Sequence, residues 1–377
     1  MKLMYISDNK MYLYDEGKVK ELPSQRAAKY ASTVREINRS KEWKQTGRGA
    51  MFMGTYQPSE ENAEIPAMIG GAVQVGEDIV YSVNLGGMGG LYRKSIENPD
   101  ADEEHVLTRM DTTLDEVALK GEKIAVIMNG HLAVADLKGD YNELIDGDTR
   151  EENPFWSVSD NRIFCSTAGF ARGQYGNIAA VSPRSIMAVG VENNSIDELY
   201  SDEKTDFLKP SNDAYGNFYY IKQPYRNVQE ENTPLWKDIL LFPVRIIKAI
   251  GGFLNAFSVI FGGESLRTNK QRGDVKTKQK SDRELYFEGR ILEAEKNERE
   301  NAAKGEKNAG ILPVSRVLVK TDSDGSETTI KRGILDYIVL DDGSIICSNG
   351  KSILHIKDGN ETVLTKAKLA HGLCILN

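Results

Sequence analysis

The segment LDYIVLDDGSIICS at residues 335–348 decides the fold of this chain. On both sides of the turn Asp341-Asp342-Gly343 lies a short apolar run, Tyr337–Leu340 before it and Ile345–Cys347 after it, as in strands bounded by turn residues. Asp and Gly at the centre are typical of tight hairpin turns. The segment therefore predicts two antiparallel strands joined by a short turn.

The same pattern of strand, tight turn and strand occurs four more times. Consecutive copies begin about 40 to 55 residues apart once one long insertion is set aside, close to the length of a four-stranded propeller blade. Each copy is followed by two further strand-like runs, so each unit holds four antiparallel strands. The copies are IGGAVQVGEDIVYSV at 69–83, LDEVALKGEKIAVIM at 114–128, FWSVSDNRIFCST at 155–167 and LKPSNDAYGNFYYIK at 208–222.

The two ends of the chain complete the count of blades. The first residues hold three strand-like runs, LMYIS, KMYLYD and KVKEL, and the chain ends in one more, HGLCILN at 371–377. Joined, these four strands make a sixth blade, and that closure removes the exposed edges of an open array of sheets. We therefore expect an all-β fold, a six-bladed β-propeller. Five blades, or seven with residues 48–68 forming one, remain alternatives.

In this arrangement the chain resembles the six-bladed β-propeller superfamily, in the broad sense that covers TolB-like and NHL-like propellers. The resemblance covers about three quarters of the chain and is one of architecture, without a family-specific motif. The Trp-Asp dipeptide and Gly-His pair of WD40 repeats are absent from the blades.

Two segments interrupt the strands, and the propeller is assigned to 1–225 and 313–377. Residues 24–45 predict a helix on the propeller rim, with Ser24 as N-cap, between blades one and two. Residues 226–312 predict an insertion between the second and third strands of blade five. Its last part, 294–310, is polar with almost nothing to bury, which predicts a mobile linker or a frayed helix.

The first part of the insertion is amphipathic. On a helical wheel, residues 235–262 have a broad, aromatic-rich apolar face and a narrow basic one, with a kink expected at Pro243. Residues 235–283 hold ten Lys and Arg against four Asp and Glu. The predicted apolar anchors are Trp236, Phe242, Ile246, Phe253, Phe257 and Phe261. The predicted electrostatic contacts are Arg245, Lys248, Arg267, Lys270, Arg272, Lys276 and Lys278.

Three locations suit such a segment. It can lie in the plane of an anionic membrane surface, where apolar burial and a polybasic run act together. It can fill a groove on a protein, either this propeller or another subunit. It can cross a bilayer, although the uncharged run 249–263 is shorter than the roughly 20 residues that a span needs.

Net charge and the spacing of cysteines and histidines argue against several kinds of partner and site. The formal net charge of −8 argues against nucleic acid as a partner. The cysteines Cys165, Cys347 and Cys374 lie far apart in apolar runs, so we expect free, buried thiols in a reducing compartment. The four histidines show no metal-binding spacing and are expected at the surface or rim, and no cofactor or metal site is predicted.

These observations favour a non-enzymatic β-propeller adaptor or scaffold. We expect it in a bacterial-type cytoplasm, because no apolar signal segment opens the chain. It would attach to a protein partner or an anionic membrane surface through residues 235–283, and a homo-oligomer is compatible with the same features. One alternative is a metal-dependent hydrolase or lactonase of the six-bladed type, with Asp115, Glu116 and Asp336 as inner-strand candidates. Another is a structural subunit of a larger assembly.

Overall fold

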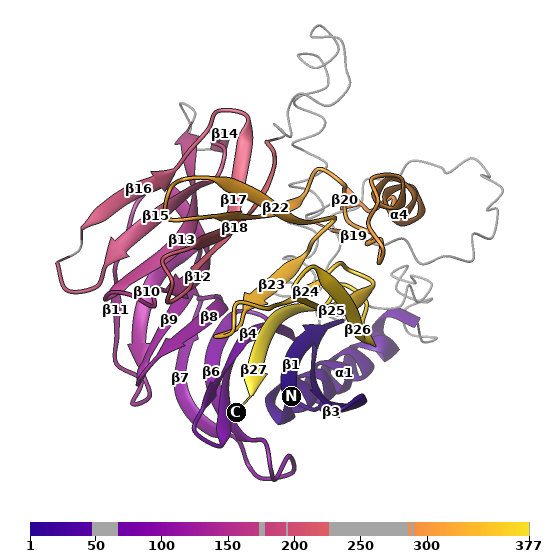
Figure 1. Ribbon diagram of the computed structural model, residues 1–377. Coiled ribbons are helices and arrows are strands. Elements are labelled where there is room, and N and C mark those ends of the chain that lie inside the picture. The colour runs from indigo at the N-terminus through magenta and orange to yellow at the C-terminus, as the bar shows by residue number, and fades with distance from the viewer. Residues whose placement is uncertain (47–66, 173–177, 194, 226–285, 288–289, 377) are drawn as a thin grey trace, which may run out of the picture. The chain divides into compact units, whose positions relative to one another are not determined.

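A computed structural model describes residues 1–46, 67–172, 178–193, 195–225, 286–287 and 290–376. The chain divides into two compact units, Met1–Tyr225 with Phe287–Asn377, and Arg226–Tyr286. The described strands of the first unit form six antiparallel sheets arranged as the blades of a propeller (Figure 1). The predicted six-bladed β-propeller is thereby confirmed.

The blades follow one another along the chain, and the strands of each blade are named from the inner edge to the outer edge. Blade one is β27 (His371–Leu376), β1 (Lys2–Ser7), β2 (Lys10–Asp15) and β3 (Lys18–Leu22). Blade two is β4 (Met68–Val75), β5 (Asp78–Asn84), β6 (Met88–Ser95) and β7 (Glu104–Met110). Blade three is β8 (Leu114–Lys120), β9 (Lys123–Met128), β10 (His131–Asp136) and β11 (Tyr141–Glu143).

The second half of the ring has the same order. Blade four is β12 (Thr149–Trp156), β13 (Arg162–Arg172), β15 (Ser185–Gly190) and β16 (Ile196–Tyr200), and β14 (Ile178–Val181) pairs with the end of β13. Blade five is β17 (Thr205–Asn212), β18 (Phe218–Pro224), β21 (Val317–Thr321) and β22 (Glu327–Arg332). Blade six is β23 (Asp336–Val339), β24 (Ile345–Ser348), β25 (Ser352–Lys357) and β26 (Asn360–Lys366). The short strands β19 (Tyr286–Phe287) and β20 (Arg290–Ile291) pair outside the blades.

The inner strands close the ring. Each of them contacts the next, in the order β27, β4, β8, β12, β17, β23 and back to β27. The closing strand pairs with the first strand of the chain, Leu376 opposite Lys2 and Cys374 opposite Met4. Blade one is thus built from both chain ends, as the sequence predicts.

The apolar core lies between neighbouring blades. Each of the six main clusters of buried apolar residues in the described part draws on two adjacent blades. Ile6 and Tyr81 join blades one and two, for example, and Ile346 and Leu3 join blades six and one. Because each blade buries both faces, burial of its apolar strands depends on the presence of both neighbours.

The helix α1 (Gln25–Thr46) lies between blades one and two, as expected. Ser24 Oγ accepts a hydrogen bond from the backbone N–H of Ala27 at 3.0 Å and lies 2.7 Å from Tyr81 Oη. The buried Glu103 carboxylate accepts the next two orphan donors, from Gln25 and Arg26. Ser24 and Glu103 together cap the helix start and tie it to blade two.

The polar segment that follows the insertion differs from its expectation. Residues Ala294–Ala303 form the helix α4, which belongs to the same unit as the blades. The amide of Asn301 is fully buried and donates to the carbonyls of Gly310 and Leu312 at 3.0 and 2.8 Å. Asn297 donates to the Ile311 carbonyl at 2.9 Å. Hydrogen bonds of buried amides therefore hold this segment, in place of the apolar side chains that it lacks.

Candidate functional site

The inner strands carry a recurring irregularity. Five of the six inner strands, all within the described residues, have one extra residue relative to the second strand of their blade. Such β-bulges bend a strand and redirect side chains, and they are frequent beside functional sites. The extra residues fall at Gly70, Asp115–Glu116, Asn153–Pro154, Lys209–Pro210 and Gly372–Leu373.

Local sequence explains two of the bulges. Proline has no N–H to give to a sheet ladder, so within a sheet it is tolerated at a bulge. Pro154 and Pro210 follow Asn153 and Lys209, whose φ angles are 55° and 51°. These are left-handed values that ordinary residues adopt only where their surroundings hold them.

The bulged residues bond to one another across blades. Asn153 Nδ2 donates to Glu116 Oε1 at 2.6 Å, and the Asn153 backbone N–H donates to the other oxygen of that carboxylate. The Lys209 backbone N–H donates to Asn153 Oδ1 at 3.2 Å, and the hydroxyl of Tyr337 donates to the Lys209 carbonyl at 2.6 Å. This chain of bonds joins blades three, four, five and six.

Lys209 adds ionic contacts to the chain. Its Nζ lies 3.1 Å from Asp336 Oδ1 on blade six and 3.8 Å from Glu116 Oε1 on blade three. Asp336 Oδ2 accepts the backbone N–H of Leu373 on blade one at 3.3 Å. We call Glu116, Asn153, Lys209, Asp336 and Tyr337 the axial cluster, because all five lie on the inner strands. Blades three and six are opposite in a ring of six, so the Lys209 ammonium links opposite sides of the ring.

Electrostatics support a tight ion pair. Burial alone would raise the pKa of Asp336, but the neighbouring Lys209 ammonium outweighs it and holds this pKa below its ordinary 3.8. Burial alone would lower the pKa of Lys209, but Asp336 and then Glu116 outweigh it and hold this pKa above 10.5. Both groups are therefore charged across the neutral range.

These shifts predict the acid dependence of stability. A lowered carboxyl pKa contributes stability that is present above the unfolded-state value and is lost as the pH falls toward the folded-state value. The free energy of unfolding should therefore fall below about pH 4, and Asp336→Asn should lower it at pH 7 while flattening this fall. Urea midpoints of both proteins at pH 7, 5, 4 and 3 check this, and two parallel profiles would contradict it.

The axial cluster bears on the metal-hydrolase alternative. The hydrolase alternative names three candidate metal ligands. Two of them, Glu116 and Asp336, both lie near the Lys209 ammonium, which occupies the place that a metal cation would take between them. The third, Asp115, accepts a bond from Asn84 Nδ2 at 3.2 Å, and burial raises its pKa. Within the described residues, no group of three or more His, Cys, Asp or Glu side chains is arranged to hold a metal ion.

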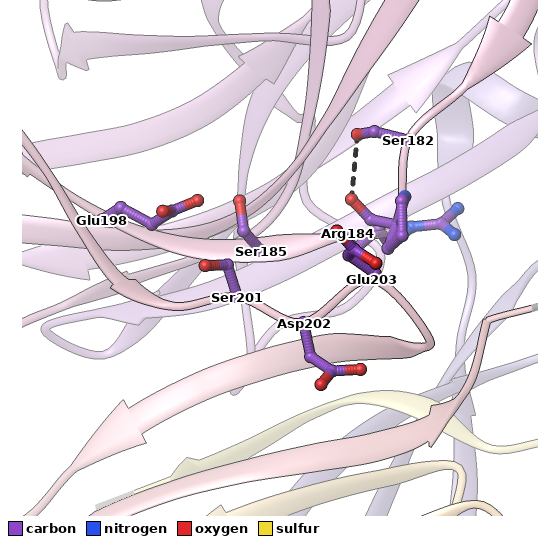
Figure 2. Close-up of a pocket in the computed structure, with 8 residues that line it drawn as sticks. Ser182, Arg184, Ser185, Glu198, Ser201, Asp202 and Glu203 are labelled. Atoms are coloured by element: carbon purple, nitrogen blue, oxygen red, sulfur yellow. Dashed lines mark hydrogen bonds between the residues drawn. The ribbon is translucent and has the colours of Figure 1, made fainter.

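A pocket of about 360 Å³ lies at the edge of blade four (Figure 2). Arg184, one of its lining residues, is held by Glu152 through two bonds of 2.9 and 3.4 Å. The serine hydroxyls around the pocket have neither a histidine nor a lysine among the lining residues to activate them as nucleophiles. Its lining includes Ser182, Arg184, Ser185, Glu198, Ser201, Asp202 and Glu203.

The predicted membrane-or-partner contacts all lie outside the described residues. This holds for the apolar anchors from Trp236 to Phe261 and for the basic residues from Arg245 to Lys278. The described part contains no helix long and apolar enough to span a bilayer. The sequence patterns missed Asn153 and Lys209, and the signal that could have found them is a proline at the same place in two repeats.

The three thiols are free, as expected, and two of them are buried. Cys165 and Cys347 are buried and Cys374 is half-buried, and all three are free. Burial raises the pKa of Cys165 and of Cys347 to about 12, so neither is a reactive thiolate at neutral pH.

The closed ring of inner strands and the six blades define this chain as a six-bladed β-propeller. No protein-family model matches the sequence, and no curated protein matches it.

Solved structures with a similar arrangement are distant. The tricorn protease is 11% identical, with a TM-score of 0.45 over 98% of this chain and 33% of its own. A putative TolB from Agrobacterium tumefaciens is 11% identical, with a TM-score of 0.36 over 97% of this chain and 90% of its own. An acylaminoacyl peptidase from Pyrococcus horikoshii is 9% identical, with a TM-score of 0.37 over 81% and 40%. The chain spans a third of the length of the tricorn protease, and these likenesses carry no argument about activity.

Proposed function

We propose that this protein is a non-enzymatic scaffold whose propeller carries the segment 235–283 to an anionic membrane surface. The observation that carries the proposal is the composition of that segment. A broad aromatic and aliphatic face over 235–262 precedes a run, 267–283, with seven basic residues and two acidic ones. Apolar burial and attraction to anionic headgroups are the two signals that together give lasting attachment to a membrane.

The anchoring of the chain on either side of the segment supports a scaffold role. Before it, the Tyr225 backbone N–H donates to the Lys204 carbonyl at 2.7 Å, and the Tyr225 hydroxyl donates to the Val181 carbonyl. After it, α4 is held by its buried asparagines and by an ion pair between Glu298 and Lys351 of blade six. The described chain that precedes and follows the segment in the sequence is thus held to the blades, which supports the propeller as the scaffold that carries it.

The axial cluster also favours a scaffold over a hydrolase. Each of its ionised groups has a partner within the ring, and the bonds join five blades. Such a cluster stiffens a platform, whereas a metal-dependent active site needs carboxylates that are available to the ion.

Co-sedimentation with vesicles tests the proposal. We expect the wild-type protein to bind phosphatidylcholine vesicles containing phosphatidylserine, and the deletion of 235–283 to abolish binding. A variant with four Gln substitutions, at Lys270, Arg272, Lys276 and Lys278, should bind at least tenfold more weakly, because each basic residue near the surface contributes up to about 1 kcal/mol.

The matched control removes four exposed lysines from the blades instead. Gln substitutions at Lys10, Lys18, Lys20 and Lys357 lower the net charge equally and should leave vesicle binding unchanged. Equal binding by the two Gln variants contradicts the proposal. Absence of vesicle binding by the wild-type protein also contradicts it and would favour a protein groove as the target.

A further inference from the structure

A second pocket, of about 450 Å³, lies where blades three and four meet. The starts of β8 and β12, the turn between β9 and β10, and the end of β13 supply its walls. We call it the blade 3–4 pocket. The lining residues that bear on ligand binding are Asp115, His131, Thr149, Arg150, Phe170 and Arg172.

A buried carboxylate orients the histidine of this pocket. His131 Nδ1 lies 3.2 Å from Glu151 Oε2, and the Glu151 side chain is fully buried. This contact fixes the imidazole and leaves Nε2 as the ring nitrogen that can bond to a ligand. Burying a carboxylate completely costs desolvation free energy. Buried ionisable groups of this kind are frequent at functional sites, so the pair of Glu151 and His131 marks a candidate site.

Thr149 and His131 both hold the buried Glu151 carboxyl. Burial raises the pKa of Glu151, and hydrogen bonds from the Thr149 hydroxyl and from His131 oppose this rise. Because Thr149 and His131 both line the pocket, Glu151 fixes two of its polar side chains.

Arg150 lies near two carboxylates, Glu152 and the pocket residue Asp115, and can turn toward a ligand without leaving Glu152 unpaired. Its Nε lies 3.1 Å from Glu152 Oε1, but Arg184 already holds that carboxylate through two bonds. When Arg150 leaves, Glu152 therefore remains paired. Arg172, paired with Asp148, adds a second guanidinium at the wall, and Phe170 adds an apolar surface. Guanidinium groups match the geometry of carboxylate and phosphate oxygens.

We infer that the blade 3–4 pocket binds a small organic anion, whose carboxylate or phosphate group meets Arg150 and His131 while the rest of the molecule packs on Phe170. This site is independent of the segment 235–283 and of the membrane proposal. No chemical step is assigned to it.

Histidine NMR gives a direct test, because the chain has only four histidines. The His131 Hε1 resonance is assigned as the one that disappears in His131→Gln. We expect this resonance to shift saturably with phenyl phosphate or with benzoate, and more weakly with inorganic phosphate, which has no ring to contact Phe170. The tighter of the two aromatic ligands identifies the anionic group that the pocket prefers.

The variants separate a built site from general charge attraction. Arg150→Gln should raise the dissociation constant at least tenfold. Arg162→Gln should leave it unchanged, since Arg162 is a partly exposed arginine that pairs with Asp160 at 2.7 Å in the same blade and lies outside the pocket lining. The other three histidine resonances report whether each variant is folded. Equal affinity of the Arg150→Gln and wild-type proteins, or a shift that does not saturate, overturns the inference.

Discussion

Replacing Lys209 by methionine is expected to lower the free energy of unfolding by about 3 kcal/mol. The methionine keeps the length of the side chain but removes the ammonium, so the Asp336 carboxylate, 6% exposed, stays in the ring without its cation. Removing one partner of a buried ion pair costs about 3–5 kcal/mol. We take the low end because the Lys209 side chain retains 21% of its exposure. Urea unfolding followed by tryptophan fluorescence measures the loss.

The control is a lysine with an equally short ion pair at the surface. Lys357 Nζ lies 2.8 Å from Asp342, but both side chains are about half exposed, so Lys357→Met should cost less than about 1 kcal/mol. Adding Asp336→Asn to Lys209→Met should restore part of the loss, because no buried charge is then left alone. A loss for Lys209→Met as small as that for Lys357→Met would contradict an ion pair that braces the ring.

Removal of residues 371–377 is expected to abolish cooperative folding. These residues include β27, the inner strand of blade one and the partner of β1. Without it, β1 gains an unpaired edge, and the inner strands β4 and β23 lose the neighbour between them. Circular dichroism and gel filtration of the shortened protein should show loss of the sheet signal or aggregation.

A circular permutant distinguishes the role of the strand from that of the chain ends. Asn377 can be joined to Met1 by a short glycine linker, because Leu376 and Lys2 are already opposite each other. New ends can be placed at the exposed turn Asp358–Gly359. This permutant should unfold at a urea concentration close to that of the wild-type protein. If the shortened protein has the same unfolding midpoint as well, ring closure by β27 is not needed for stability.

The sequence predicts the ring well because strand alternation and turn residues are local signals. The segment around Asp341-Asp342-Gly343 forms the predicted pair of antiparallel strands, β23 and β24. The strand HGLCILN forms β27 and closes blade one. The helix after Ser24 follows from its cap and apolar spacing. The packing of helix α4 does not follow from the sequence, because its stability comes from Asn297 and Asn301 bonding to carbonyls that only the folded chain brings near.

The axial cluster and the blade 3–4 pocket are beyond the sequence patterns for a different reason. Their members come from several blades, and their pairing depends on how the ring brings the inner strands together, most of them bulged. The repeat pattern predicts that Asp336 and Glu116 lie on inner strands. The sequence around these two residues does not indicate that Lys209 pairs with them. His131 and Glu151 likewise meet only because the β9–β10 turn lies beside the neighbouring inner strand.

The bulges also limit how the blades of this chain could be rearranged. Although the five copies share one strand pattern, they differ in what they place at the axis: blades three and six contribute a carboxylate, blade four an amide and blade five an ammonium. Exchanging blade five for a duplicate of blade three would face acid with acid and remove the only lysine among them. Exchanging blades in this repeat protein would therefore require redesign of the axial cluster, even where the outer strands are interchangeable.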